Sequence, residues 1–83
     1  MSRLLPTDKD GKWFLDEMRE HVEEIRELLE RGDEIYRGDK TCGEHARTEA
    51  YDLIVLTAEL FGMGDVLDSV PEEIIERFNQ KRR

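Results

Sequence analysis

The chain has little that would tie it together covalently or place it in a membrane. Its single cysteine, Cys42, excludes a disulfide within the chain. No apolar run approaches the roughly 18 residues of a membrane-spanning helix. The segment before Pro6 is too short for the apolar core of a secretory signal. We therefore expect a cytoplasmic protein that does not enter a membrane.

Positive charge is also scarce. The sequence has 13 Lys and Arg against 21 Asp and Glu, which gives a net charge of −8 and a pI of about 4.7. Proteins bind nucleic acids and anionic membranes mainly through Lys and Arg, so the charge balance argues against both classes of partner. A phosphate-bearing ligand is compatible with this charge if divalent cations bridge it to the acidic groups.

Apolar residues are few but ordered. They make up 37% of the 83 residues, and a chain of this length buries only about 60% of its unfolded surface. The apolar positions recur with helical periodicity, which indicates a folded single domain and not a disordered chain. We expect a thin core whose remaining apolar surface is covered by another copy of the chain.

The apolar spacing predicts a helix near the N-terminus. Residues 1–11 are expected to form an irregular arm that precedes a single all-α domain at 12–83. A helix is expected over 12–31, because apolar residues recur there on one face. This stripe consists of Met18, Val22, Ile25 and Leu29, and is widened by Phe14 and Leu28.

Two further helices are expected after a glycine-containing connector at 32–43, in which we predict no strand. The second helix, at about 44–61, is apolar on nearly every face and is therefore expected to be buried. After a short turn at 65–68, a third helix at about 70–81 would start from a capping box at Ser69. The predicted fold class is all-α: a small bundle of two long helices and a shorter C-terminal helix, completed by homo-oligomerisation.

Acidic residues at helical spacing form two clusters. Glu23, Glu24 and Glu27 spell E-E-x-x-E, and after 21 intervening residues Glu49 and Asp52 spell E-x-x-D at the head of the buried helix. The first cluster alone would fit a solvated helix face. A carboxylate on a buried helix, however, costs several kcal/mol unless it is compensated. Antiparallel helices would bring both clusters together, and several carboxylate oxygens suit Mg²⁺ or Mn²⁺. The sequence therefore predicts a divalent-metal site.

Other chemically active residues carry less information. Cys42 and His45 have C-x-x-H spacing but lack the second pair that tetrahedral zinc requires, so we interpret them as a surface cysteine and a helix-start histidine. His21, flanked by acids, is interpreted as solvated. For Trp13 and Phe14, packing in the core or an interface is favoured over stacking on a base.

The two acidic motifs resemble the signature of the MazG-type all-α nucleotide pyrophosphohydrolases. Glu23-Glu24-Ile25-Arg26-Glu27 and Glu49-Ala50-Tyr51-Asp52 match it residue for residue. The closing segment Glu76-Arg77-Phe78-Asn79-Gln80-Lys81-Arg82 is similar to the family's last helix, in which an aromatic-Asn-x-x-Arg pattern faces the nucleotide. The family has a full helix before E-E-x-x-E. Here only the arm precedes Trp13, which implies a nucleobase pocket that is incomplete or borrowed from a partner chain.

The resemblance implies hydrolysis of a nucleoside triphosphate to a monophosphate and pyrophosphate, dependent on Mg²⁺ or Mn²⁺, by a homodimer or homotetramer. The resemblance implies that Glu24, Glu27, Glu49 and Asp52 bind the metal. It implies that Glu23 binds a second metal or positions the attacking water, and that the phosphate or base is contacted by Asn79, Lys81 and Arg82. Three alternatives stay open. They are a non-catalytic oligomerisation or regulatory module with the same fold, an acidic partner-binding bundle without metal, and an enzyme similar to phosphoribosyl-ATP pyrophosphatase.

Overall fold

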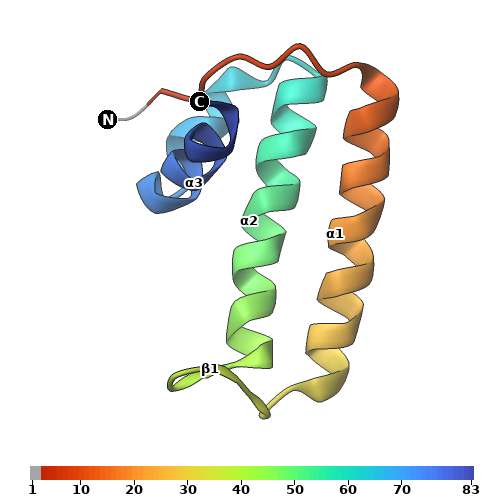
Figure 1. The fold of residues 1–83 in the computed structure, drawn as a ribbon, viewed down its shortest axis with the longest axis vertical. Helices are drawn as coiled ribbons and strands as arrows, with labels where there is room; N and C mark the ends of the chain where they lie inside the picture. The colour runs from red at the N-terminus through yellow and green to blue at the C-terminus, as the bar shows by residue number, and fades with distance from the viewer. Residues whose placement is uncertain (1–2) are drawn as a thin grey trace.

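The computed structural model describes residues 3–83 and is a helical bundle with one small hairpin (Figure 1). The helices are α1 (Gly11–Arg31), α2 (Cys42–Leu60), the 3-10 helix η1 (Gly64–Ser69) and α3 (Glu72–Arg82). The long helices α1 and α2 run antiparallel side by side, and α3 lies beside α2 on the side away from α1. The predicted all-α bundle of two long helices and a shorter C-terminal one is confirmed. No helix within residues 3–83 is long and apolar enough to cross a membrane.

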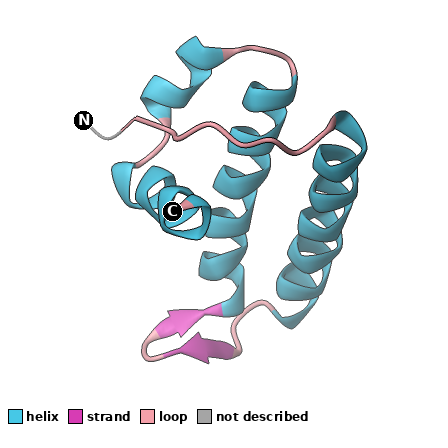
Figure 2. Cartoon of the chain, turned by 45° about the horizontal axis from the view of Figure 1, so that its top comes forward, coloured by secondary structure: helices cyan, strands magenta, loops and turns pink. Residues whose placement is uncertain are grey.

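The connector between the long helices contains a β-hairpin, so the prediction that it has no strand was wrong. Strands β1 (Ile35–Arg37) and β2 (Lys40–Thr41) pair antiparallel at the end of the bundle (Figure 2). Gly38 supplies the turn with a φ of 60°, a conformation that favours glycine. Strands of three and two residues are too short to show the alternating pattern by which strands are identified in a sequence.

The N-terminus of α2 is fixed by a capping box that we did not predict from the sequence. The Thr41 side chain accepts a hydrogen bond from the Glu44 backbone N–H, and the Glu44 carboxylate accepts one from the Thr41 N–H. The box predicted at Ser69 and Glu72 was wrong, because Ser69 is the last residue of η1 and its hydroxyl donates back to a carbonyl there. Helix α3 starts without a side-chain cap.

Replacing Thr41 with alanine is therefore expected to lower the free energy of unfolding by about 1 kcal/mol, the usual cost of losing an N-cap. Urea denaturation would measure the change. The matched control is Ser69→Ala, for which we expect a change below about 0.5 kcal/mol because its hydroxyl is exposed. Equal losses in the two variants would contradict the assignment of the cap to Thr41.

Helix α2 is the centre of the core. Its Val55 and Leu56 side chains are 0% and 1% exposed. One face of α2 packs against α1, and another packs against α3 and η1. Ala46 and Ala58 of α2 are also buried, and the buried apolar residues outside it are Phe14, Leu28, Val70, Ile74 and Ile75. A helix enclosed on two sides must be apolar over most of its circumference, which explains the apolar character of its sequence.

The apolar stripe predicted for α1 divides into two faces. Phe14 and Leu28, which only widened the predicted stripe, are the buried members, whereas Val22 and Leu29 remain 47% and 62% exposed. Among residues 3–83, α2 is the one helix that packs against α1, so part of the apolar surface of α1 faces outward. Cys42 packs with Leu28 and is 1% exposed, which corrects its interpretation as a surface cysteine.

Candidate functional site

Three titratable side chains meet in the middle of the α1–α2 interface. His21 comes from α1, and Glu49 and Asp52 come from α2. One nitrogen or oxygen atom of each lies within 4.8 Å of the other two. His21 Nε2 is 3.5 Å from both Glu49 Oε2 and Asp52 Oδ2. We call these residues the central cluster.

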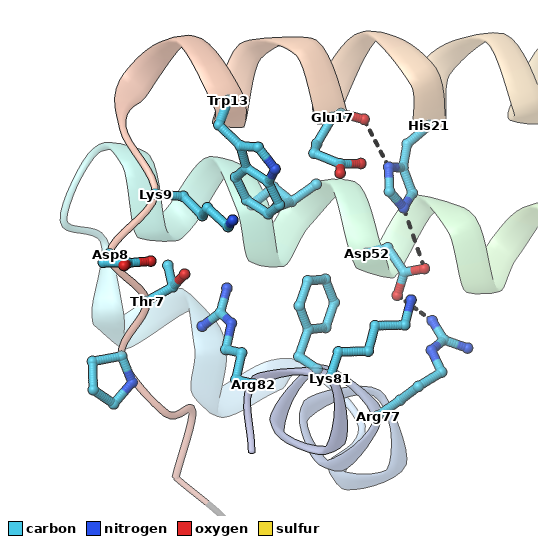
Figure 3. A pocket seen from close by; sticks show the side chains of 13 residues that line it. Thr7, Asp8, Lys9, Trp13, Glu17, His21, Asp52, Arg77, Lys81 and Arg82 are labelled. Atoms are coloured by element: carbon cyan, nitrogen blue, oxygen red, sulfur yellow. Dashed lines mark hydrogen bonds and ion pairs between the residues drawn. The ribbon is translucent and has the colours of Figure 1, made fainter.

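The position of His21 corrects its interpretation as a solvated residue, since its side chain is only 18% exposed. His21 lies seven residues from Phe14 and from Leu28, which places all three on the face of α1 that meets α2. Its Nδ1 is 2.8 Å from the Glu17 carbonyl oxygen (Figure 3). The seven-residue spacing from Phe14 and Leu28 indicated that His21 faces α2. The acidic residues next to His21 in the sequence favoured the interpretation of a solvated residue instead.

An arginine and a second histidine also contact the two carboxylates of the cluster. Arg77 of α3 donates a hydrogen bond to Asp52, whose side chain is 8% exposed. His45 Nε2 lies 3.3 Å from Glu49 Oε1, and the His45 ring stacks on Tyr36 with centroids 3.8 Å apart. Asp52 is thus contacted by Arg77 of α3 and His21 of α1, and Glu49 by His21 of α1 and His45 of α2.

The two acidic motifs meet at a cleft beside the central cluster. This acidic cleft, of about 240 Å³, is lined by Glu24, Glu27, Leu28, Arg31, Tyr36, His45 and Glu49. Glu24 lies close enough to Glu49 to raise the pKa of that carboxyl, after the larger effect of burial. The expectation that α1 and α2 would bring the acidic clusters together therefore holds for Glu24, Glu27 and Glu49. Glu23, predicted to act in catalysis, is exposed and lines neither this cleft nor the larger cavity described next.

A larger cavity opens on the other side of the cluster. It has a volume of about 490 Å³ and reaches from His21 and Asp52 to the N-terminal arm, so we call it the arm-side cavity (Figure 3). Four cationic side chains line it, against three acidic ones, in a chain of net charge −8. The cationic residues are Lys9, Arg77, Lys81 and Arg82, and the acidic ones are Asp8, Glu17 and Asp52.

The three residues expected to contact phosphate or base occupy different positions. Lys81 lines the arm-side cavity and extends from α3 toward Asp52. Arg82 also lines it, but its guanidinium pairs with Glu59 at 2.8 and 2.9 Å and donates to the Leu5 carbonyl. Asn79 is 2% exposed, and its side-chain amide hydrogen-bonds the backbone of the arm at residues 3 and 5. Asn79 and Arg82 thus hold the arm against α3 through hydrogen bonds to its backbone.

Burial and crowding shift the protonation of the central cluster. Burial, then the proximity and charge of Glu24, then the charge of Asp52 together raise the pKa of Glu49 to about 7. Hydrogen bonding to Asp52 raises the pKa of His21 to about 9, against the opposing effect of burial. Burial lowers the pKa of His45, helped by the charges of Lys40 and Arg77.

These shifts predict how the stability of the metal-free protein depends on pH. Glu49 and His21 both hold a proton more tightly in the folded than in the unfolded chain. The free energy of unfolding should therefore fall as pH rises from about 4.5 to 7 through Glu49 and from about 6.5 to 9 through His21. The groups that face His21 are the Glu17 carbonyl, Glu49 and Asp52.

The measurement is chemical denaturation in EDTA at fixed ionic strength across this pH range. His21→Gln should flatten the upper part of the curve, and Glu49→Gln the lower part. Glu20→Gln, at an exposed position of α1, is the control and should leave the curve unchanged. A free energy of unfolding that rises between pH 6.5 and 9 in the unmodified protein would contradict the assigned shifts.

The donor atoms present fit a divalent cation. The carboxylate oxygens of Glu49 and Asp52, with Glu24 beside Glu49, suit Mg²⁺ or Mn²⁺. Without a cation, burial and then the neighbouring carboxylates Glu24 and Asp52 raise the pKa of Glu49. Compared with models of protein families, with curated proteins and with solved structures, the chain matches none of them.

Proposed function

We propose that the protein is a Mg²⁺- or Mn²⁺-dependent nucleoside triphosphate pyrophosphohydrolase, which converts a (d)NTP to a (d)NMP and pyrophosphate. The observation that supports this most is the contact between Glu24 and Glu49 beside Asp52. It joins the E-E-x-x-E and E-x-x-D motifs at one place between α1 and α2. That arrangement is the one expected from the resemblance to the MazG-type family.

Each group of residues has a definite role in this proposal. Glu24, Glu27, Glu49 and Asp52 would hold the cation, and His21 orients the last two carboxylates. A bound divalent cation neutralises phosphate charge and lowers the pKa of a water molecule. Glu23 would act from the solvent side, on a second cation or on the attacking water.

The α3 side of the arm-side cavity would bind the phosphates. Lys81 and Arg77 extend toward Asp52 from this helix (Figure 3). Among residues 3–83, Lys81 makes no hydrogen bond or ion pair, so its ammonium group is available to a phosphate oxygen. Arginine and lysine donors at transferring phosphates stabilise the charge that develops there.

One observation favours a second candidate, a non-catalytic helical module that keeps the fold. Asp52 is already compensated by Arg77 and His21, so its charge is satisfied without a cation. A cation would have to compete with the Arg77 guanidinium for the carboxylate. In the enzyme, binding of phosphates would draw Arg77 away from Asp52.

The decisive experiment is a screen for pyrophosphate release over all eight common NTPs and dNTPs with Mg²⁺ or Mn²⁺, combined with thermal melting. The enzyme predicts release from at least one nucleotide, loss of release in Asp52→Asn, and a melting temperature raised by the cation, since ligands of the native state stabilise it. No release from any nucleotide would contradict the enzyme and support the non-catalytic module, whose Asp52 is satisfied by Arg77 and His21 whether or not a cation binds.

We further propose that a second copy of the chain covers the outer face of α1. The residues Leu15, Met18, Val22, Ile25 and Leu29 step by three and four along this helix, the spacing of a helix–helix seam. Leu15, Val22 and Leu29 are 56%, 47% and 62% exposed in the single chain. Monomeric proteins rarely expose so continuous an apolar stripe.

Replacing Val22 with glutamate is expected to convert the oligomer to a monomer, because it places a charge in the middle of this stripe. Size-exclusion chromatography with light scattering would measure the mass. Arg26→Glu, at an exposed α1 position outside the stripe, is the control and should keep the oligomer. A monomeric wild-type protein, or an unchanged mass for Val22→Glu, would contradict the proposal that a second copy covers this face of α1.

A further inference from the structure

The wall of the arm-side cavity is built by a segment held at both ends. Pro6, Thr7, Asp8 and Lys9 line the cavity. Before them, Asn79 accepts a hydrogen bond from the Leu5 N–H at 2.7 Å and Arg82 donates to the Leu5 carbonyl. After them, the Asp10 carboxylate caps α1 by accepting a hydrogen bond from the Trp13 N–H at 2.9 Å. The arm therefore closes the cavity as a fixed wall.

The same end of the cavity is aromatic. Trp13 of α1 and Phe78 of α3 both line it. The Trp13 ring packs edge-on against the buried Phe14 ring, with centroids 5.1 Å apart, so one edge of the indole is fixed while its side chain faces the cavity (Figure 3). The volume of about 490 Å³ is that of a small-molecule site. Planar aromatic ligands gain from stacking on such a ring.

An acidic side chain stands next to this ring. Glu17 lies one helical turn after Trp13 and lines the cavity, and among residues 3–83 its carboxylate makes no hydrogen bond or ion pair. An ionised carboxylate has only acceptor sites, on two oxygens side by side. A ligand that fills the cavity must offer donors there, because a desolvated acceptor without a donor is costly.

We infer that the arm-side cavity selects nucleotides with a guanine base, which stacks on Trp13 and donates two hydrogen bonds to Glu17. Guanine carries adjacent N1–H and 2-amino donors, which match the two oxygens of a carboxylate. Uracil and thymine carry a single N–H between two carbonyl oxygens that repel the carboxylate. The inference rests on the proposed function, since the phosphates are taken to lie at the central cluster beside Lys81.

The test uses the fluorescence of Trp13, which is the only tryptophan of the chain and reports the cavity directly. The full-length protein is titrated with the non-hydrolysable α,β-methylene analogues of GTP, ATP, CTP and UTP in the presence of Mg²⁺. We expect quenching by the guanine analogue at a concentration at least about tenfold lower than by the uracil analogue, since sites built around hydrogen bonds reject ligands that lack them.

Two variants separate the role of Glu17 from general charge effects. Glu17→Gln should reduce the preference for guanine about tenfold or more, because the amide presents a donor where guanine also presents one. Glu20→Gln removes the same charge from an exposed position of α1 and should leave the preference intact. Circular dichroism of both variants would verify that they are folded.

The outcomes distinguish this inference from the proposed function. Equal quenching by all four analogues, or an unchanged preference in Glu17→Gln, would overturn the guanine assignment even if pyrophosphate is released from other nucleotides. Selective quenching by the guanine analogue without pyrophosphate release from any triphosphate would refute the proposed hydrolysis and support the guanine site. No quenching by any analogue would overturn the assignment of the cavity to a base.

Discussion

In the proposed hydrolase, replacing Glu49 with glutamine is expected to lower pyrophosphate release at least about 100-fold, because even the hydrogen-bonding partners of metal ligands are typically worth 10- to 100-fold. The same change should raise the thermal stability of the protein in EDTA at pH 8. Glu49 has a pKa raised to about 7 by burial and by Glu24, so the folded state at pH 8 holds this carboxylate ion unfavourably. A neutral amide removes that cost.

The two effects together are more informative than either alone. A residue kept for stability would lower the melting temperature when it is replaced, whereas a metal ligand placed among other carboxylates raises it. Steady-state assays and melting curves with and without Mg²⁺ would measure both effects, with Glu20→Gln as the control at an exposed site of the same net charge change. Lower stability in EDTA together with unchanged turnover would refute the proposed role of Glu49.

Replacing Arg82 with methionine is expected to lower the free energy of unfolding by about 3–5 kcal/mol, the cost of breaking a buried ion pair on one side. The Arg82 and Glu59 side chains are 8% and 18% exposed and are joined by two hydrogen bonds. The variant would leave the Glu59 carboxylate uncompensated and the Leu5 carbonyl without its donor. Whole domains are stable by only about 5–15 kcal/mol, so this chain would come close to unfolding.

Guanidinium denaturation would measure the loss of unfolding free energy in Arg82→Met, and two further variants would test its cause. Arg82→Met combined with Glu59→Leu should recover much of the stability, because no unpaired charge is then buried. Arg83→Met, in the exposed pair with Glu76, should change the free energy of unfolding by less than about 1 kcal/mol. A loss in Arg83→Met as large as that in Arg82→Met would show that burial of the Arg82 pair is not the cause.

The elements that the sequence predicted well are those with a long, repeated signal. Helix α1 was expected over 12–31 and extends over Gly11–Arg31, and α2 was expected over 44–61 and extends over Cys42–Leu60. Several turns of apolar periodicity outweigh local ambiguity. The hairpin, the cap at Thr41 and the starting point of α3 each depend on a few residues, for which the sequence offered competing candidates.

The candidate site could be predicted only in part. The spacing of Glu24, Glu27 and Glu49 along two helices was visible in the sequence, and antiparallel pairing of these helices places all three at one cleft. His21 and Arg77 were missed because their partners lie on other helices. Asn79 and Arg82 hydrogen-bond the backbone of the arm because residues 3–5 pass close to α3. No local sequence pattern predicts that contact.

By itself, the order of amino acids determined that this chain forms helices, that α2 must be enclosed, and that acidic groups lie on the two long helices, because periodicity and burial costs act locally along the chain. Only the tertiary structure decided which side chains share the space between α1, α2 and α3. The protonation of His21 and Glu49, the closure of the arm-side cavity and the outward face of α1 all follow from contacts between residues far apart in the chain. Packing, and not propensity, fixes such contacts.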